Sequence, residues 1–256
     1  MFSWDPDCYL QCANERRRPI QDLIQHISFE QPAHIIDLGC GPGNSTAELR
    51  KRWPAAEITG IDQSTTMLNK ARQSCPQVTW VKADIRCWQA SEPVDILFAN
   101  AVLHWLPKHD VLFPQLIAQL SPVGVFAMQM PANIDAPLHK VVDDLVESSY
   151  WRKRFSSIVN RVTLERTTFY YDLLAPLCCY LDMWETRYYH VMKSHEAILN
   201  WFRGTGLRPY LAALNNKDWQ QEFEQQVLQG YQHAYPKQIT GDIVLPFRRL
   251  FIIANR

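Results

Sequence analysis

The chain has 256 residues and a mass of 29.8 kDa, and it carries 26 acidic and 26 basic side chains, so its formal net charge is zero. This length is sufficient to bury a hydrophobic core, and the balanced charge argues against a nucleic-acid-binding protein, which usually has a basic excess. Seven cysteines without a CxxC pair, and the lack of an apolar leader or membrane-spanning run, predict a soluble cytoplasmic protein.

The first 131 residues alternate between apolar runs of strand length and segments with helical spacing. "PAHIIDLGC" at 32–40 predicts a buried strand, and Ser45 followed by Glu48 resembles a capping box that opens the next helix. Such alternation predicts a doubly wound α/β fold with a parallel sheet and helices on both faces. The further strands are expected at 56–62, 78–84, 94–100 and 124–131, and the further helices at 64–74 and 110–120.

The remainder of the chain is helical and rich in aromatic residues. It contains a strand candidate at 181–192 and ends on the apolar run 242–256. We therefore expect one domain over 1–256, with a Rossmann-like, seven-stranded, mostly parallel sheet and helical insertions at about 132–180 and 193–240. If 181–192 joins the sheet in parallel, both insertions leave from the carboxyl ends of strands and form a helical lid there.

Three glycines follow the first predicted strand at alternate positions, Gly39, Gly41 and Gly43. Glycine allows a sharp turn and close approach of a ligand to the backbone. The spacing GxGxG differs from the dinucleotide fingerprint GxGxxG, in which the third glycine comes one place later. The turn therefore predicts a nucleotide-like cofactor, which need not contain a pyrophosphate.

Acidic and amide residues follow the predicted strands and would share one edge of the sheet. Asp62 can accept both ribose hydroxyl protons, and Asp84 suits the exocyclic amine of adenine. Asp37 with Asn100 suits an ammonium group, although Asp37 could equally cap the turn. Three carboxylates favour a ligand with an ammonium and a sulfonium group, and would repel a pyrophosphate.

The runs "DLGCGPGNST", "GIDQS", "ADI" and "FANAVLHWLP" resemble the S-adenosylmethionine-dependent methyltransferases with a seven-stranded sheet. "WDPDCYLQCANERRRP", "HWLP", "TGLRPYL" and "FRRLFIIANR" resemble the bacterial trans-aconitate 2-methyltransferase family in particular. The resemblance implies methyl transfer from S-adenosylmethionine to a carboxylate of trans-aconitate or a close polycarboxylate, with S-adenosylhomocysteine as the second product.

The resemblance also implies residue roles. The glycines would line the methionine moiety, the backbone at Ile85 would help Asp84 to hold adenine, and the Asn100 carbonyl would receive the amino group. Tyr9 and Arg18 would fold over the cofactor or the substrate. The expected cofactor contacts are Tyr9, Asp37, Gly39, Gly41, Gly43, Asp62, Asp84, Ile85 and Asn100.

A carboxylate substrate is already ionised at neutral pH, so the reaction needs no general base, and no base motif is evident. Catalysis would depend on positioning and on exclusion of water. Arginine grips a carboxylate best because its planar fork can donate two parallel hydrogen bonds. Arg248 and Arg249 are neighbours on a predicted strand, so at most one can face the substrate. The candidate substrate residues are Arg18, His104, Trp105, Arg187, Tyr189 and Arg208.

Three other functions also fit the sequence. The same chemistry could act on a malonyl group bound to acyl carrier protein, the chain could be an NAD-dependent oxidoreductase, or it could bind the cofactor without catalysis. "AVLHW" follows Asn100 in place of the Asn/Asp-Pro-Pro-Tyr type of tetrapeptide, which favours oxygen on a small molecule over nucleic-acid amines. The histidine spacings fit no metal site, and Cys40 is expected to pack rather than react.

Overall fold

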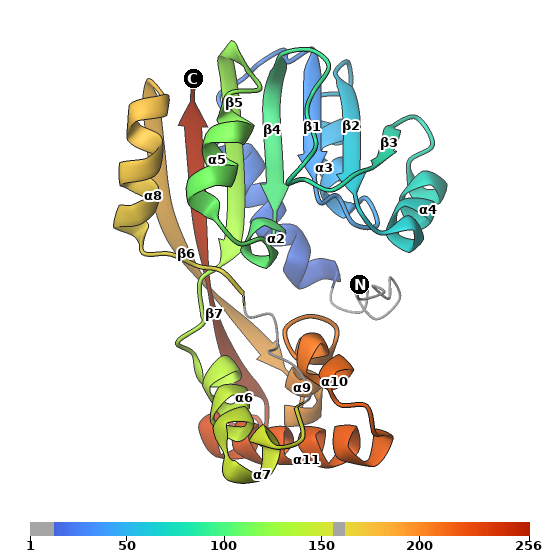
Figure 1. The fold of residues 1–256 in the computed structure, drawn as a ribbon, viewed down its shortest axis with the longest axis vertical. Coiled ribbons are helices and arrows are strands. Elements are labelled where there is room, and N and C mark those ends of the chain that lie inside the picture. Colours follow the sequence, from blue (N-terminus) through green and yellow to red (C-terminus); the bar gives the residue numbers. More distant parts are fainter. Residues whose placement is uncertain (1–12, 156–161) are drawn as a thin grey trace. The chain divides into compact units, whose positions relative to one another are not determined.

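The computed structural model describes residues 13–155 and 162–256 (Figure 1). The chain divides into two compact units. The sheet unit comprises the described parts of Ser3–Pro131, Val162–Thr186 and Arg249–Arg256. The helical unit comprises the described parts of Ala132–Arg161 and Arg187–Arg248. Each unit has its own packed interior.

A seven-stranded sheet has the order β3-β2-β1-β4-β5-β7-β6. The strands from β3 to β5 are parallel, and β7 runs antiparallel to β5. The predicted Rossmann-like, mostly parallel sheet is therefore confirmed. The last two strands continue from one unit into the other. The strands are β1 (His34–Leu38), β2 (Glu57–Asp62), β3 (Thr79–Lys82), β4 (Val94–Asn100), β5 (Leu120–Pro131), β6 (Tyr180–Met192) and β7 (Ile243–Asn255).

Helices cover both faces of the sheet, as the alternation predicted. In Figure 1, α5 lies in front of β5, whereas α2 and α3 lie behind the sheet. The central strands are apolar and fully buried, with Ile35, Leu38, Ile96 and Phe98 at 0% exposure. The helices of this unit are α2 (Ala13–Gln25), α3 (Asn44–Arg52), α4 (Thr65–Ser74), α5 (His109–Ile117) and α8 (Thr167–Leu174), with the short turns η1 (Leu103–Trp105) and η2 (Ala175–Leu177).

The start of α3 differs from the predicted capping box. Gly43 precedes the helix with φ +92°, and no side chain caps it. Ser45 lies inside the helix, and its hydroxyl donates to the buried Asp37 at 2.7 Å. Glu48 instead pairs with Arg17 at 3.1 Å. The capping-box prediction was wrong because the buried carboxylate takes the hydroxyl that a cap would use.

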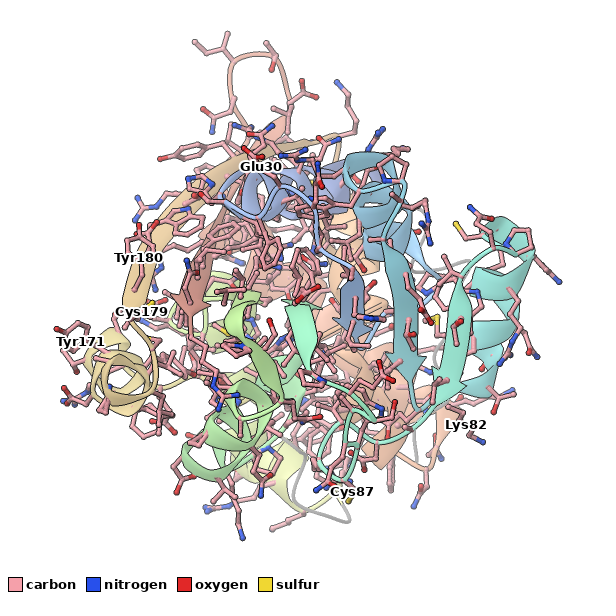
Figure 2. The ribbon with its side chains drawn as sticks, turned by 90° about the horizontal axis from the view of Figure 1, so that it is seen from above. Glu30, Lys82, Cys87, Tyr171, Cys179 and Tyr180 are labelled. Carbon is pink, nitrogen blue, oxygen red and sulfur yellow. The ribbon has the colours of Figure 1, made fainter. Side chains whose placement is uncertain are left out.

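The first predicted insertion is divided between the two units. Residues 162–180 belong to the sheet unit, where α8 packs on α5. His109 of α5 and the Tyr170 hydroxyl of α8 are hydrogen-bonded at 2.9 Å. Figure 2 shows Tyr171, Cys179 and Tyr180 on the outer side of this unit. That the helical segments act as a lid over the strand ends stays a prediction from the sequence.

The helical unit has an aromatic interior with satisfied polar groups. The Trp151 indole donates to Gln226 at 2.7 Å, and the Tyr231 hydroxyl donates to the Leu138 carbonyl at 2.9 Å. Helix α11 packs against α6 and α9. No helix in the described parts of the chain is long and apolar enough to cross a bilayer. The helices of this unit are α6 (Pro137–Glu147), α7 (Ser149–Arg152), α9 (His195–Arg203), α10 (Arg208–Ala213) and α11 (Lys217–Ala234).

We expect Gly230→Ala to destabilise the helical unit. A Cβ atom at Gly230 would lie 2.3 Å from Cγ1 of Val141, a β-branched side chain with little rotamer freedom. Overpacking of this kind costs about 1–3 kcal/mol, more than the gain of about 1 kcal/mol in helix propensity. Urea unfolding would measure the loss. Gln225→Ala, at an exposed position of the same helix, is the control, and adding Val141→Ala should recover part of the loss. A Gly230→Ala variant as stable as the parent would contradict the close packing.

Candidate functional site

The candidate site lies at the carboxyl ends of β1, β2 and β4, within the sheet unit. The chain moves from β1 outward to β3 and then returns to β4 on the other side of β1. Ligands of open α/β sheets bind at such a switch point, beyond the strand ends. The glycine loop and the polar residues singled out in the sequence follow these strands.

The glycine loop has a left-handed backbone at all three glycines, with φ +64° at Gly39, +55° at Gly41 and +92° at Gly43. A Cβ atom at Gly39 would lie 2.2 Å from Cγ2 of Val102, so this side of the loop is closely packed. A Cβ atom at Gly41 would meet nothing within 4 Å. The loop therefore presents bare backbone at Gly41, where a ligand can approach.

Asp62 stands beside this open backbone. Its Oδ2 accepts the Gly41 N–H at 3.0 Å, and its Oδ1 accepts the Ser64 N–H at 2.7 Å. Burial raises the pKa of this carboxyl group, and the two N–H donors act in the opposite direction. Each oxygen still has a lone pair for a further donor. The geometry suits a ligand with neighbouring hydroxyl groups.

Asp37 lies beneath the loop, and its side chain is fully buried. Its Oδ2 accepts the hydroxyls of Ser45 at 2.7 Å and Thr46 at 2.5 Å. Burial raises the pKa of Asp37 to about 7, partly offset by these hydrogen bonds. The expected contact with an ammonium group stays a prediction, since both hydroxyls bind Oδ2 alone. Asp37 fastens the first turn of α3, which is the alternative that the sequence left open.

Asp84 lies two residues beyond β3, which ends earlier than predicted. The Arg86 guanidinium holds it at both oxygens, with Nε 3.0 Å from Oδ1 and Nη2 2.5 Å from Oδ2. This ion pair lowers the pKa of Asp84. Ile85, the other expected adenine contact, has a buried side chain. An adenine amine would have to share Asp84 with Arg86.

Asn100 ends β4 and belongs to a polar chain that reaches into the sheet. Its Oδ1 accepts from Gln129 Nε2 at 2.8 Å, and Gln129 Oε1 accepts from Arg249 Nη1 at 2.8 Å. The next residue, Ala101, has φ +52°, a conformation that costs a non-glycine residue about 1–3 kcal/mol and is common at functional sites. Gln129 was missed in the sequence, although a glutamine inside the apolar run "GVFAMQMP" was a usable signal.

Arg248 and Arg249 point to opposite sides of β7, as predicted. Arg248 Nε donates to the Ala132 carbonyl at 2.8 Å, and its Nη2 pairs with Asp135 at 2.7 Å, all in the helical unit. Arg249 is 5% exposed and belongs to the sheet unit. The two cations therefore have different surroundings.

The η1 turn carries two of the candidate substrate residues, His104 and Trp105. His104 is buried, and its carbonyl accepts the Thr163 N–H at 2.7 Å. His109 Nε2 bonds the Leu103 carbonyl at 3.0 Å, which requires a proton on Nε2. Its Nδ1 therefore accepts from Tyr170, and burial lowers the pKa of His109. This network fixes η1 to α5 and α8.

The remaining substrate candidates are spread over the chain. Arg18 is exposed on α2 in the sheet unit. Arg187 and Tyr189 are exposed at alternate positions of β6, and Arg208 begins α10, all in the helical unit. Tyr9 lies outside the described residues. The structure brings the expected cofactor residues of the sheet unit to one edge, whereas the roles of the substrate candidates stay predictions.

Two further side-chain types bear on the chemistry of this edge. Cys40 is a buried free thiol, and burial raises its pKa well above the usual range, which supports a packing role. Among the residues that the structure describes, no three histidine, cysteine or carboxylate side chains are grouped so that they could hold a metal ion.

Comparison with known proteins gives a consistent set of similarities. A methyltransferase-domain model matches residues 35–124. Two relatives named trans-aconitate 2-methyltransferase, from Yersinia pseudotuberculosis serotype O:1b (strain IP 31758) and Escherichia coli O45:K1 (strain S88 / ExPEC), are each 46% identical over 256 residues. Each alignment covers 100% of this chain and 99% of the relative.

Solved structures share the fold at low identity. The YcgJ protein of Bacillus subtilis has a TM-score of 0.62 at 15% identity, over 93% of this chain and 98% of its own. The O-methyltransferase of a trans-AT polyketide synthase multienzyme from Brevibacillus brevis, in complex with S-adenosylhomocysteine, has a TM-score of 0.54 at 14% identity, over 94% and 71%. At these identities, the likeness shows the fold alone.

We expect Asp37→Asn to remove a pH dependence of stability. The raised pKa of Asp37 means that its contribution is present below the unfolded value of 3.8 and is lost as the pH rises through about 7. Between these values, wild-type stability should fall relative to the variant by about 1.4 kcal/mol per pH unit. Urea unfolding at pH 5, 6 and 8 would measure it. Asp110→Asn, an exposed carboxylate on α5, is the control, and equal slopes in wild type and Asp37→Asn would show that Asp37 keeps an ordinary pKa.

Proposed function

Because the chain belongs to the trans-aconitate 2-methyltransferase family, we propose that it transfers a methyl group from S-adenosylmethionine to one carboxylate of trans-aconitate or a close small polycarboxylate. The protein is a methyltransferase, and its methyl donor is S-adenosylmethionine. The products are the monomethyl ester and S-adenosylhomocysteine. The observation that carries the proposal is the open backbone at Gly41 beside Asp62, in a chain that aligns over its full length with this family.

The residues at the strand ends fit this methyl donor. Gly41 leaves space against the backbone, and Asp62 offers acceptor lone pairs to the two ribose hydroxyls. Asp84 would accept from the adenine amine in exchange for part of its pairing with Arg86. Asp62 adds to the raised pKa of Asp37 by repulsion, so a ligand bearing positive charge would reduce the repulsion between the two carboxylates.

The reaction requires no proton transfer to a side chain of the protein. S-adenosylmethionine supplies an electrophilic methyl group bound to a sulfonium. The ionised carboxylate oxygen of the acid forms the new bond to the methyl carbon as the carbon–sulfur bond breaks, and that electron pair stays on sulfur. The chain's own residues must hold the acid in line and exclude water from it, and no residue needs to accept a proton.

The acid-binding residues belong to the proposal. We infer that arginines grip the carboxylates not being methylated, because their planar forks match carboxylate geometry. His104 and Trp105 are the candidates nearest to Asn100 in the chain, on the η1 turn. The other proposed acid contacts are Arg18, Arg187, Tyr189 and Arg208, with Tyr9 folding over the cofactor. We also propose a cytoplasmic location, which the five free cysteines of the described residues support.

A substrate screen tests the proposal. Purified protein would be incubated with isotopically labelled S-adenosylmethionine and, in parallel, trans-aconitate, other di- and tricarboxylates, and malonate bound to acyl carrier protein. We expect mass spectrometry to show a labelled monomethyl ester of trans-aconitate. Ester formed on carrier-bound malonate and absent from every free acid would overturn the substrate assignment.

Asp62→Ala should weaken the binding of S-adenosylhomocysteine at least about tenfold, because hydrogen bonds to a charged group contribute about 1.5–3 kcal/mol each. At saturating cofactor, the KM for the acid should change little. Titration calorimetry gives the affinity. Since Asp62 also holds Gly41 and Ser64, Asp62→Asn, which keeps one acceptor oxygen, is the matched variant and should lose less. Unchanged affinity in a folded Asp62→Ala protein would remove Asp62 from the ribose site.

A further inference from the structure

Asn100, Gln129 and Arg249 share one face of the sheet. Asn100 of β4 lies opposite Gln129 of β5, and Gln129 lies opposite Phe251 of β7. Arg249 precedes Phe251 by two residues, so its side chain projects from the same face. Two hydrogen bonds of 2.8 Å join the three polar side chains across these strands. Each member of the row can therefore set the orientation of the next.

The chemistry of arginine determines which way the side-chain amides of Gln129 and Asn100 are turned. A guanidinium group donates hydrogen bonds and accepts none, so the oxygen of the Gln129 amide must face Arg249. The Gln129 nitrogen then faces Asn100, and the oxygen of the Asn100 side chain must receive it. Arginine stays charged at any physiological pH, so this orientation does not change with pH.

The orientation of the amides determines which end of Asn100 is left for a ligand. Gln129 is 0% exposed and Arg249 is 5% exposed, whereas Asn100 is half-buried at the strand end. With its oxygen committed to Gln129, the side chain of Asn100 has its NH₂ group left for a ligand. A side-chain NH₂ donates to an acceptor, and the nearby buried cation favours an acceptor with negative charge.

We propose that Arg249 and Gln129 are positioning residues that hold the Asn100 side chain as a hydrogen-bond donor to a carboxylate at the carboxyl edge of the sheet. The proposal rests on the proposed function, which brings two carboxylates to this edge: that of the methionine moiety of the cofactor and that of the acid. The chemistry is the same for both, and the experiment distinguishes them.

Gln129→Glu is the decisive variant. A carboxylate at position 129 still pairs with Arg249, so the fold keeps its buried contact. It cannot donate to Asn100, however, and the Asn100 amide must turn its NH₂ inward and its oxygen toward the ligand. We expect the affinity for the bound carboxylate to fall at least tenfold while the melting temperature is kept or raised. A merely structural role of Gln129 would leave ligand affinity unchanged in a stable variant.

Three measurements identify the carboxylate. The Kd of S-adenosylhomocysteine rises, and that of 5′-methylthioadenosine, which lacks the amino-acid part, stays unchanged, if Asn100 binds the cofactor carboxylate. The KM for trans-aconitate rises, with unchanged S-adenosylhomocysteine affinity, if Asn100 binds the acid. The proposal would be overturned if the variant lost as much affinity for 5′-methylthioadenosine as for S-adenosylhomocysteine. It would also be overturned if a folded variant lost no affinity for any ligand.

Two further variants complete the design. Asn100→Asp accepts from Gln129 as before but presents an oxygen outward, so it should give the same loss without altering Gln129 or Arg249, even if Gln129→Glu folds poorly. Gln115→Glu makes the matched substitution at an exposed position of α5 and should change no affinity.

The failure of this proposal is distinguishable from that of the proposed function. Wild-type protein that forms no ester from trans-aconitate would end the proposed function, while the S-adenosylhomocysteine titrations would still test Asn100. Wild-type protein that forms the ester, with unchanged affinities in Gln129→Glu and Asn100→Asp, would end the positioning proposal alone.

Discussion

Two carboxylates hold the glycine loop, and the candidate site depends on this constraint. Asp37 lies beneath the loop and binds the first turn of α3 through the hydroxyls of Ser45 and Thr46. Asp62 binds the backbone of Gly41 and of Ser64, which caps α4, and so ties the loop to the next helix. Contacts within the protein itself therefore hold the loop, which reduces what binding must order.

The same arrangement selects the charge of the ligand. Asp62 raises the pKa of Asp37 through repulsion, in addition to the larger effect of burial. An anion at Gly41 would add to this repulsion, whereas a cation would reduce it. Because burial raises the pKa of Asp37 to about 7, ionising this carboxyl group at neutral pH lowers the stability of the folded protein. That cost has a functional reason if the ligand carries a sulfonium and an ammonium group.

The sequence predicted what depends on local pattern, and missed what depends on distant pairing. Buried strands and a mostly parallel sheet followed from alternation, and the acids at strand ends followed from the strands. The role of Ser45 did not, because Asp37 competes for its hydroxyl. Gln129 and Arg249 are 120 residues apart, and only the antiparallel register of β7 on β5 brings them together. α8 was assigned to an insertion because helical, aromatic sequence does not say which unit it packs against.

The strand order places hydrogen-bond acceptors and hydrogen-bond donors on different parts of the sheet edge. Strands β1, β2 and the segment after β3 carry carboxylates at this edge, whereas β4, β5 and β7 carry Asn100, Gln129 and Arg249. The switch point between β1 and β4 is therefore also the boundary between an acceptor-rich half and a donor-rich half of the edge. A cationic methyl donor suits acceptors and an anionic acid suits donors, and this edge offers both. Arg249 fits this division although it is buried. It orients the Gln129 amide, which in turn orients Asn100 as a donor, while the charge of Arg249 stays away from water.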